Sequence, residues 1–187
     1  AARGVPWCLG RCSGISRAAA YRGPEIARAV FGPADAAMAS GPHDREAKAL
    51  AVDGGYRVTG RWTFASGSRH AQWLGGHSLI CEPDGSPRLG PDGKPLELRT
   101  MLFPKSSATI TDVWQVMGLR GTGSDNYAVK DVFVPADYSF TRELAADRRE
   151  QGPLYRFSIF NMFGVAFSAV ALGFARHGLR PGHDEAP

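Results

Sequence analysis

The stretch GGYRVTGRWTFASGSRHAQW, residues 54–73, decides the fold of this chain. Its Gly-Gly turn is followed by residues of two alternating kinds, with Tyr56 and Val58 against Arg57 and Thr59. Alternation with a period of two predicts a β-strand, in which side chains two positions apart share one face. The sequence therefore predicts a strand that starts at the turn and has one face in a core.

The end of this predicted strand carries side chains suited to holding a flat heteroaromatic ring. Alternation places Phe64 and Ser66 on one face, together with Trp62. An aromatic side chain packs against such a ring, a hydroxyl hydrogen-bonds its edge, and Gly67 lets the backbone come close. From the residues alone, a serine bonded to its own backbone and aromatic side chains in a core remain the alternative.

A second glycine-rich segment is GLRGTGSDNYAVKDVFVP at 118–135. It lacks the GxGxxG spacing of a dinucleotide-binding loop, and a predicted strand follows it instead of a helix. Arg120, Thr122 and Ser124 supply hydrogen-bond donors in this turn. A structural β-corner explains the same residues equally well.

The two segments together resemble the middle β-domain of the acyl-CoA dehydrogenase superfamily, and most of all its flavin-dependent monooxygenase branch. The resemblance covers roughly residues 4–178. It implies a flavin cofactor, FAD or FMN, whose reactive N5 atom lies near one hydroxyl, which makes Ser66 the expected catalytic residue. The resemblance further implies a set of cofactor-binding residues: Phe64, Ser66, Gly67, Ser40, Arg120, Thr122 and Ser124.

The composition is that of an ordinary folded protein. The chain has 187 residues, of which 43% are hydrophobic and 10% aromatic, enough for one core and against a disordered chain. The net charge is +4, yet the basic residues are scattered. Their densest cluster, 142–149, is interleaved with acidic residues, which is typical of a solvated helix face and not of a phosphate-binding patch. We therefore expect no nucleic-acid partner.

Cysteine usage and hydropathy predict a cytoplasmic protein without metal or membrane span. Cys8, Cys12 and Cys81 lack metal-ligand spacing and are expected to be reduced thiols. The longest apolar segment, 157–174, is interrupted by polar residues and glycine, so that no uninterrupted run reaches about 18 residues. It is expected to be a buried helix. The first residues show no signal-peptide pattern.

The order of the predicted elements is helix, β-domain, helix. Helices are expected over 7–20, 24–31 and 154–178, with a short strand and a polar loop within 36–51. The predicted fold class is α+β, an antiparallel β-barrel or sandwich flanked by partial helical domains, with domains at 1–36, 37–140 and 141–187. Further strands are expected over 48–52, 56–64, 73–81, 97–104, 108–113 and 127–134.

The resemblance implies a flavin-dependent oxidoreductase. The Phe-x-Ser-Gly step favours a monooxygenase that uses reduced flavin and oxygen on an aromatic substrate, and a flavin reductase is then an expected partner. Dehydrogenation of an acyl thioester is the other option, but it needs a carboxylate base, and the family supplies that base from a helical domain that this chain mostly lacks. The full-length relatives are expected to be homo-oligomers. The alternative is a catalytically incomplete β-domain fragment that acts only as a binding or interaction module.

Overall fold

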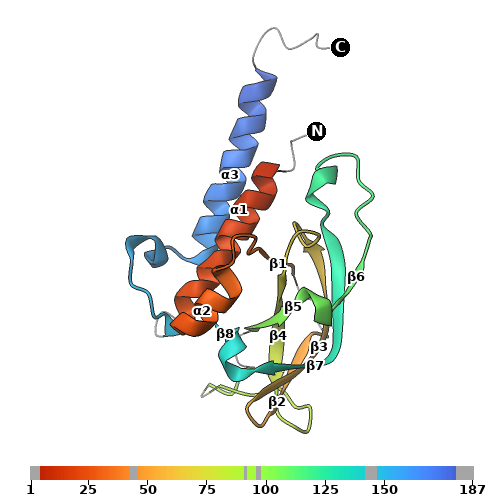
Figure 1. Ribbon diagram of the computed structural model, residues 1–187, viewed down its shortest axis with the longest axis vertical. Coiled ribbons are helices and arrows are strands. Elements are labelled where there is room, and N and C mark those ends of the chain that lie inside the picture. The colour runs from red at the N-terminus through yellow and green to blue at the C-terminus, as the bar shows by residue number, and fades with distance from the viewer. Residues whose placement is uncertain (1–4, 43–45, 91, 96–97, 142–146, 180–187) are drawn as a thin grey trace.

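The computed structural model describes residues 5–42, 46–90, 92–95, 98–141 and 147–179. Two helices, α1 (Val5–Ser16) and α3 (Ile159–Gly178), lie side by side next to a sheet, and α2 (Pro24–Phe31) follows below α1 (Figure 1). The strands are β1 (Met38–Ser40), β2 (Lys48–Val52), β3 (Gly55–Ala65), β4 (Trp73–Cys81), β5 (Arg99–Pro104), β6 (Thr109–Thr111), β7 (Asp125–Pro135) and β8 (Ser139–Phe140).

The sheet corrects the predicted antiparallel barrel. Its strand order is β6-β7-β3-β2-β4-β5-β8, with β1 paired to β4, so the end strands β6 and β8 are not joined and the barrel is open. The sheet is also mixed, because β4 runs parallel to both β1 and β2. The path of the chain after β3 explains the parallel pairing. Only the first half of β3, Gly55–Thr59, pairs with β2. The turn after β3 then reverses the chain, and β4 returns on the other side of β2, parallel to it.

The strand β3 follows the predicted alternation only as far as Trp62. Val58 and Trp62 are buried, but the register with β7 shifts between Trp62 and Ala65, and Phe64 has a positive φ of 52°. This bulge changes which face each side chain takes, so that Phe64 is 59% exposed while Ala65 is buried. The predicted common face of Trp62, Phe64 and Ser66 is therefore wrong for Trp62, which lies in the core.

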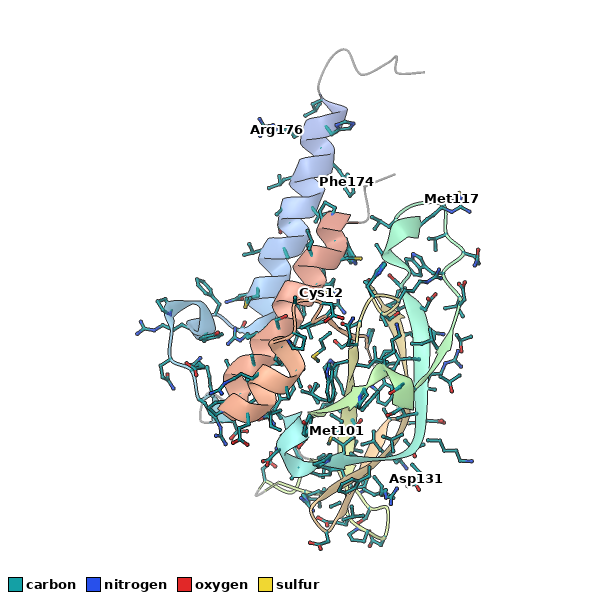
Figure 2. All side chains as sticks on the ribbon, in the orientation of Figure 1. Cys12, Met101, Met117, Asp131, Phe174 and Arg176 are labelled. Atoms are coloured by element: carbon teal, nitrogen blue, oxygen red, sulfur yellow. The ribbon has the colours of Figure 1, made fainter. Side chains whose placement is uncertain are left out.

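The core cluster of the sheet contains three aromatic side chains that contact one another. Trp62 stacks on Tyr127 with 5.2 Å between ring centroids and also packs against Phe103. The polar atoms of these rings are satisfied, since the Trp62 Nε1 donates to the His77 carbonyl and the Tyr127 hydroxyl donates to the Gly75 carbonyl. Met101 is fully buried within the sheet, whereas Met117 lies at the exposed end of the segment after β6 (Figure 2). This core fixes the position of the β3 end.

The remaining predictions of elements are largely confirmed. The predicted strands 48–52 and 73–81 coincide with β2 and β4, while the strand predicted from residue 97 begins at Arg99, and residues 96–97 lie outside the described residues. The first helix is shorter than predicted, because a 3₁₀ segment, η1 (Arg17–Tyr21), replaces its last turn. There the Ser16 hydroxyl donates to the Cys12 carbonyl, a bond that competes with the helix ladder.

The helix α3 corrects the expectation of a buried helix. Its apolar side chains are mostly exposed, Val165 at 71% and Leu172 at 69%, and Phe174 and Arg176 lie on the part of α3 that extends beyond α1 (Figure 2). With 20 residues and a mean hydropathy of 1.5, α3 is long and apolar enough to cross a membrane, by length and composition only. The interruptions that argued against a span are small or weakly polar side chains, which a long helix tolerates.

The predicted domain limits stay predictions. The end of α2 at Phe31 precedes β1 at Met38, and β8 ends at Phe140. The predicted third domain includes 142–146 and 180–187, which lie outside the described residues, as does part of the polar loop that follows β1.

Candidate functional site

A cavity of about 250 Å³ lies beside the end of β3. Phe64 and Ser66, which simple alternation placed on one face of the strand, both line it, although a bulge interrupts the alternation after Trp62. Phe64 meets Trp114 edge to face with 5.9 Å between ring centroids, so two aromatic rings border the cavity. Its lining comes from α1, the β3 end and the segment before β7: Trp7, Arg11, Pro42, Phe64, Ser66, Trp114, Leu119, Thr122 and Ser124.

A chain of hydroxyl groups runs along one wall of this cavity. The Ser66 Oγ lies 2.7 Å from the Ser124 Oγ, and the Ser124 Oγ lies 2.7 Å from the Thr122 Oγ1. At one end of the chain, the Thr122 hydroxyl donates to the Leu119 carbonyl at 3.0 Å. At the other end, the Trp7 Nε1 donates to the Ser66 Oγ at 3.0 Å.

Counting protons fixes the direction of this chain. Each hydroxyl has one proton, and a carbonyl only accepts. Because Thr122 gives its proton to Leu119, Ser124 must donate to Thr122, and Ser66 must then donate to Ser124. The Ser66 Oγ also accepts from Trp7. It is left with one lone pair and no proton to offer a further ligand.

Backbone geometry holds the two loops that carry these hydroxyls. Leu119 and Gly123 both have positive φ, 53° and 48°, and they close the 3₁₀ turn η3 (Arg120–Thr122) from either side. Gly67, at φ 81°, donates its N–H to the Thr122 carbonyl at 2.9 Å. This conformation favours glycine, and the predicted role of Gly67 toward a cofactor stays a prediction. The turn after β3 and the turn before β7 are thereby joined.

An ion pair holds the turn before β7, just beyond the cavity. The Asp125 carboxylate is buried and accepts two hydrogen bonds from Arg69, at 2.7 and 3.1 Å. Arg69 also reaches Asp112 at 2.9 Å, which lies on the segment leading to Trp114. The Arg69 hydrogen bond lowers the pKa of Asp125 below its ordinary value. The carboxylate therefore stays ionised and holds the turn in place at neutral pH.

The other predicted cofactor-binding residues lie in different places. Thr122 and Ser124 line the cavity, but Arg120 is exposed and is not among its lining residues. Ser40 is buried at a separate small cavity of about 20 Å³, and touches the site only through its carbonyl, which accepts from the Arg11 Nη2 at 2.8 Å. Their roles toward a cofactor stay predictions.

Sequence reasoning missed three residues of the site. Trp7 and Arg11 come from α1, far from the motifs in sequence, and nothing in the pattern of α1 indicates this role. Trp114 precedes the glycine-rich turn, and its Nε1 donates to the same Leu119 carbonyl that ends the hydroxyl chain. The short sequence distance between Trp114 and the glycine-rich turn was the one feature that could have indicated its place in the site. Trp7 also stacks on Phe167 of α3, 4.7 Å between ring centroids, which connects α3 to the site.

Two curated relatives give the first comparison with known proteins. The chain is 37% identical over 134 residues to the flavin-dependent monooxygenase, oxygenase subunit HsaA, of Mycobacterium tuberculosis, a match that covers 67% of this chain and 31% of the relative. It is 39% identical over 113 residues to the FADH(2)-dependent resorcinol hydroxylase, oxygenase component, of Rhizobium sp., covering 60% and 26%. The chain thus spans about a third or less of these relatives.

Two solved structures share the fold. The HsaA monooxygenase from M. tuberculosis superposes with a TM-score of 0.77 at 28% identity, covering 92% of this chain and 44% of that chain. XiaF from Streptomyces sp., solved in complex with FADH2 and glycerol, gives a TM-score of 0.73 at 26% identity, covering 91% and 42%.

No protein-family model matches the chain. The relatives and the solved structures nevertheless agree with each other and with the motifs at 54–73 and 118–135. The predicted resemblance is thereby confirmed: this chain is a homologue of flavin-dependent monooxygenase oxygenase subunits, in that branch of the acyl-CoA dehydrogenase fold.

Proposed function

We propose that this chain forms the flavin-contacting part of an oxygenase that hydroxylates a small aromatic molecule with reduced flavin and oxygen. The relatives are named as oxygenase subunits or components, one of them FADH(2)-dependent. Such names support a separate flavin reductase as the partner that supplies reduced flavin. When bound, the flavin supplies the oxygen chemistry, and the residues of this chain bind the ring and set its surroundings.

The shape and lining of the Ser66 cavity fit the ring of a flavin. Two aromatic side chains, Phe64 and Trp114, border it, and its polar lining consists of the linked hydroxyls together with Arg11 and the Trp7 indole N–H. At about 250 Å³ it is slightly smaller than the roughly 300–1,000 Å³ of whole small-molecule sites. It therefore suits the tricyclic ring, and the rest of the cofactor would extend beyond it.

The direction of the hydroxyl chain is the observation that carries the proposal. Ser66 gives its own proton to Ser124 and keeps only a lone pair for a ligand. The N5 atom of a reduced flavin bears a hydrogen and donates, whereas N5 of an oxidised flavin only accepts. Ser66 in this state therefore complements the reduced ring. Acyl thioester oxidation, which begins from oxidised flavin, is less well supported.

The cavity lining meets a demand of hydroxylation. The carboxylate base that dehydrogenation needs would come from the helical domain that this chain mostly lacks, so the lining bears on hydroxylation alone. Hydroxylation by reduced flavin makes a different demand, a dry ring edge with a fixed hydrogen-bond acceptor. Trp7, Phe64 and Trp114 line the cavity and would cover that edge, and Ser66 would be the acceptor.

Anaerobic calorimetric titration with reduced and oxidised FAD and FMN tests this proposal. We expect the chain to bind the reduced form about tenfold more tightly, the value of one well-placed hydrogen bond. Ser66→Ala should reduce this preference to about twofold or less, while Ser107→Ala, at an exposed serine, should keep it. Tighter binding of oxidised flavin, or bleaching of bound flavin by an acyl thioester, would contradict it.

A second candidate, the incomplete fragment, is favoured by the exposed apolar surface of α3. In this reading the chain binds flavin weakly or serves only as an interaction module, because helical partners of α3 are needed for a full site. We further propose that the whole protein is a cytoplasmic homo-oligomer in which such partners cover α3. A monomeric chain that holds one flavin per molecule would exclude the fragment reading.

A further inference from the structure

A second pocket, of about 380 Å³, lies away from the Ser66 cavity and shares no lining residue with it. It is formed where three segments distant in sequence meet. Arg22 comes from the link between η1 and α2, Arg99 from the start of β5, and Arg149 from the segment before α3. We call this cavity the arginine pocket, after these three side chains. In Figure 1 the neighbouring α2 and the strand β8, which supplies Ser139 to the pocket, lie at the end of α1 opposite its N-terminus.

Backbone carbonyls and one hydroxyl hold two of these arginines, and among the described residues no carboxylate forms an ion pair or hydrogen bond with them. Arg22, only 9% exposed, donates through Nη1 to the carbonyls of Asp137 and Ser139 and lies over the Phe140 ring. Arg99 donates through Nε and Nη2 to the hydroxyl and carbonyl of Ser139, at 2.8 and 3.2 Å. These bonds orient the two guanidiniums without neutralising their charges.

Arg149 is oriented by its backbone. Its N–H donates to the Ala20 carbonyl at 2.8 Å, which places the residue against η1 and close to Gly23. No described residue accepts a hydrogen bond from its guanidinium, and none forms an ion pair with it within the described ranges. Its donors are available to a ligand in the pocket.

The local charge remains positive. Asp137 and Asp147 also line the pocket, but three guanidiniums outnumber two carboxylates. The pKa of Arg22 falls to about 10, chiefly because burial disfavours its charge and further because Arg99 and Arg149 repel it. Arg22 therefore still carries its charge at neutral pH. The prediction of a solvated helix face over 142–149 is wrong for 147–149, which form no α-helix, and 142–146 lie outside the described residues.

We propose that the arginine pocket binds a phosphate group, free or carried by a small phosphorylated metabolite. Guanidiniums pair with phosphate oxygens through short, charge-assisted hydrogen bonds, and three of them from different segments suit a tetrahedral anion better than a planar carboxylate. A phosphate here would join the N-terminal helices, the β5–β8 edge and the segment before α3. Because it would bind only the folded chain, it would also stabilise that chain.

Thermal unfolding and calorimetry of the full chain test this proposal. Inorganic phosphate and glycerol 2-phosphate are compared with sodium chloride at equal ionic strength and with acetate. The variant Arg149→Gln removes the unpaired guanidinium, and Arg61→Gln, at an exposed position on β3, is the matched control. Asp137→Asn removes a competing negative charge and leaves the carbonyl that accepts from Arg22.

The expected result is a higher Tm with phosphate than with chloride or acetate. Arg149→Gln should weaken phosphate binding about tenfold, Arg61→Gln less than twofold, and Asp137→Asn should strengthen it. Tighter binding of glycerol 2-phosphate than of inorganic phosphate would identify a phosphorylated metabolite as the ligand, and the reverse would identify free phosphate. Three results would overturn the proposal. They are an equal loss of phosphate affinity in Arg149→Gln and Arg61→Gln, a Tm with phosphate no higher than with chloride, and weaker phosphate binding by Asp137→Asn. If Arg149→Gln does not fold, Asp137→Asn decides the question.

Discussion

At the scale of single residues, Thr122 controls the hydrogen-bond direction on which the proposed function depends. Its proton goes to the Leu119 carbonyl, which obliges Ser124 and then Ser66 to donate inward. In Thr122→Val the Ser124 proton loses its acceptor and can turn toward Ser66, which frees the Ser66 proton for a ligand. The preference for reduced over oxidised flavin should then fall to about twofold or less, and stability should drop by about 1–2 kcal/mol.

Thr109→Val, at an exposed position on β6, is the control for this change. It should leave both the flavin preference in titration and the free energy of unfolding in urea close to those of the unchanged chain. If Thr122→Val keeps the full preference for reduced flavin, the direction of the hydroxyl chain does not determine it.

Asp125 should make the stability of the chain depend on acid pH. Its pKa in the folded chain is depressed, first of all by the Arg69 hydrogen bond, so its contribution is present above the ordinary Asp pKa of about 3.9. That contribution is lost as the pH falls from there through the folded pKa. Asp125→Asn should cost about 1–2 kcal/mol at pH 7, after allowance for the half-exposed Arg69, and should flatten the loss below about pH 4.

Urea unfolding of both chains between pH 2.5 and 7 measures this effect, with Asp92→Asn as an exposed control. An unchanged slope of stability against pH in Asp125→Asn would show that other carboxylates cause the acid loss.

The residues nearest the β3 motif could be predicted from sequence, and the rest of the site could not. Ser66, Phe64 and Gly67 follow one another on a strand end, so a short pattern was enough to bring them to one cavity. Trp7 reaches Ser66 across 59 positions of sequence. Arg120 has a suitable side chain but faces solvent, because η3 turns it away from the cavity. Contacts that depend on how distant elements pack leave no local pattern.

At the scale of elements, the sheet depends on close packing of β4 against the Trp62 ring. A Cβ added at Gly76 would lie 2.6 Å from the Trp62 Cζ2, and that ring is fixed between Tyr127 and Phe103. Gly76→Ala should therefore destabilise the chain by about 1–3 kcal/mol through overpacking. Gly118→Ala, where a Cβ meets nothing within 4 Å, should change stability by about 0.5 kcal/mol or less. Urea unfolding measures the stability change of each variant. Equal changes in Gly76→Ala and Gly118→Ala would contradict the prediction, because they would mean that the Trp62 ring moves aside to accept the added methyl group.

Strand positions were predictable from period-two patterning and turn residues, but the sheet's topology was not. Lys48–Val52 and Trp73–Cys81 were located to the residue. The parallel pairing of β2 with β4 arises because β4 returns on the side of β2 opposite β3, which alternation does not reveal. The same bulge exposes Phe64, whereas Trp62, which precedes it, stays in the core on the face of Val58.

At the scale of the whole molecule, the exposed apolar surface of α3 should drive self-association of the isolated chain. Leu172 and Phe174 are 69% and 49% exposed. Apolar surface of this kind is typical of an interface. The double change Leu172→Lys and Phe174→Lys should shift the chain toward monomer in size-exclusion chromatography with light scattering. Ala171→Lys, also exposed on α3 but small, is the control, and a monomeric unchanged chain would contradict the expectation.

The central claim is that Ser66 accepts a hydrogen bond from N5–H of a reduced flavin in the cavity beside β3. The most direct measurement is anaerobic NMR of reduced FMN labelled with ¹⁵N at N5, mixed with the chain and with Ser66→Ala. The account predicts a shifted N5 signal and slowed N5–H exchange with the unchanged chain, both lost in Ser66→Ala. An N5 signal that is the same with both proteins while flavin is bound would contradict it.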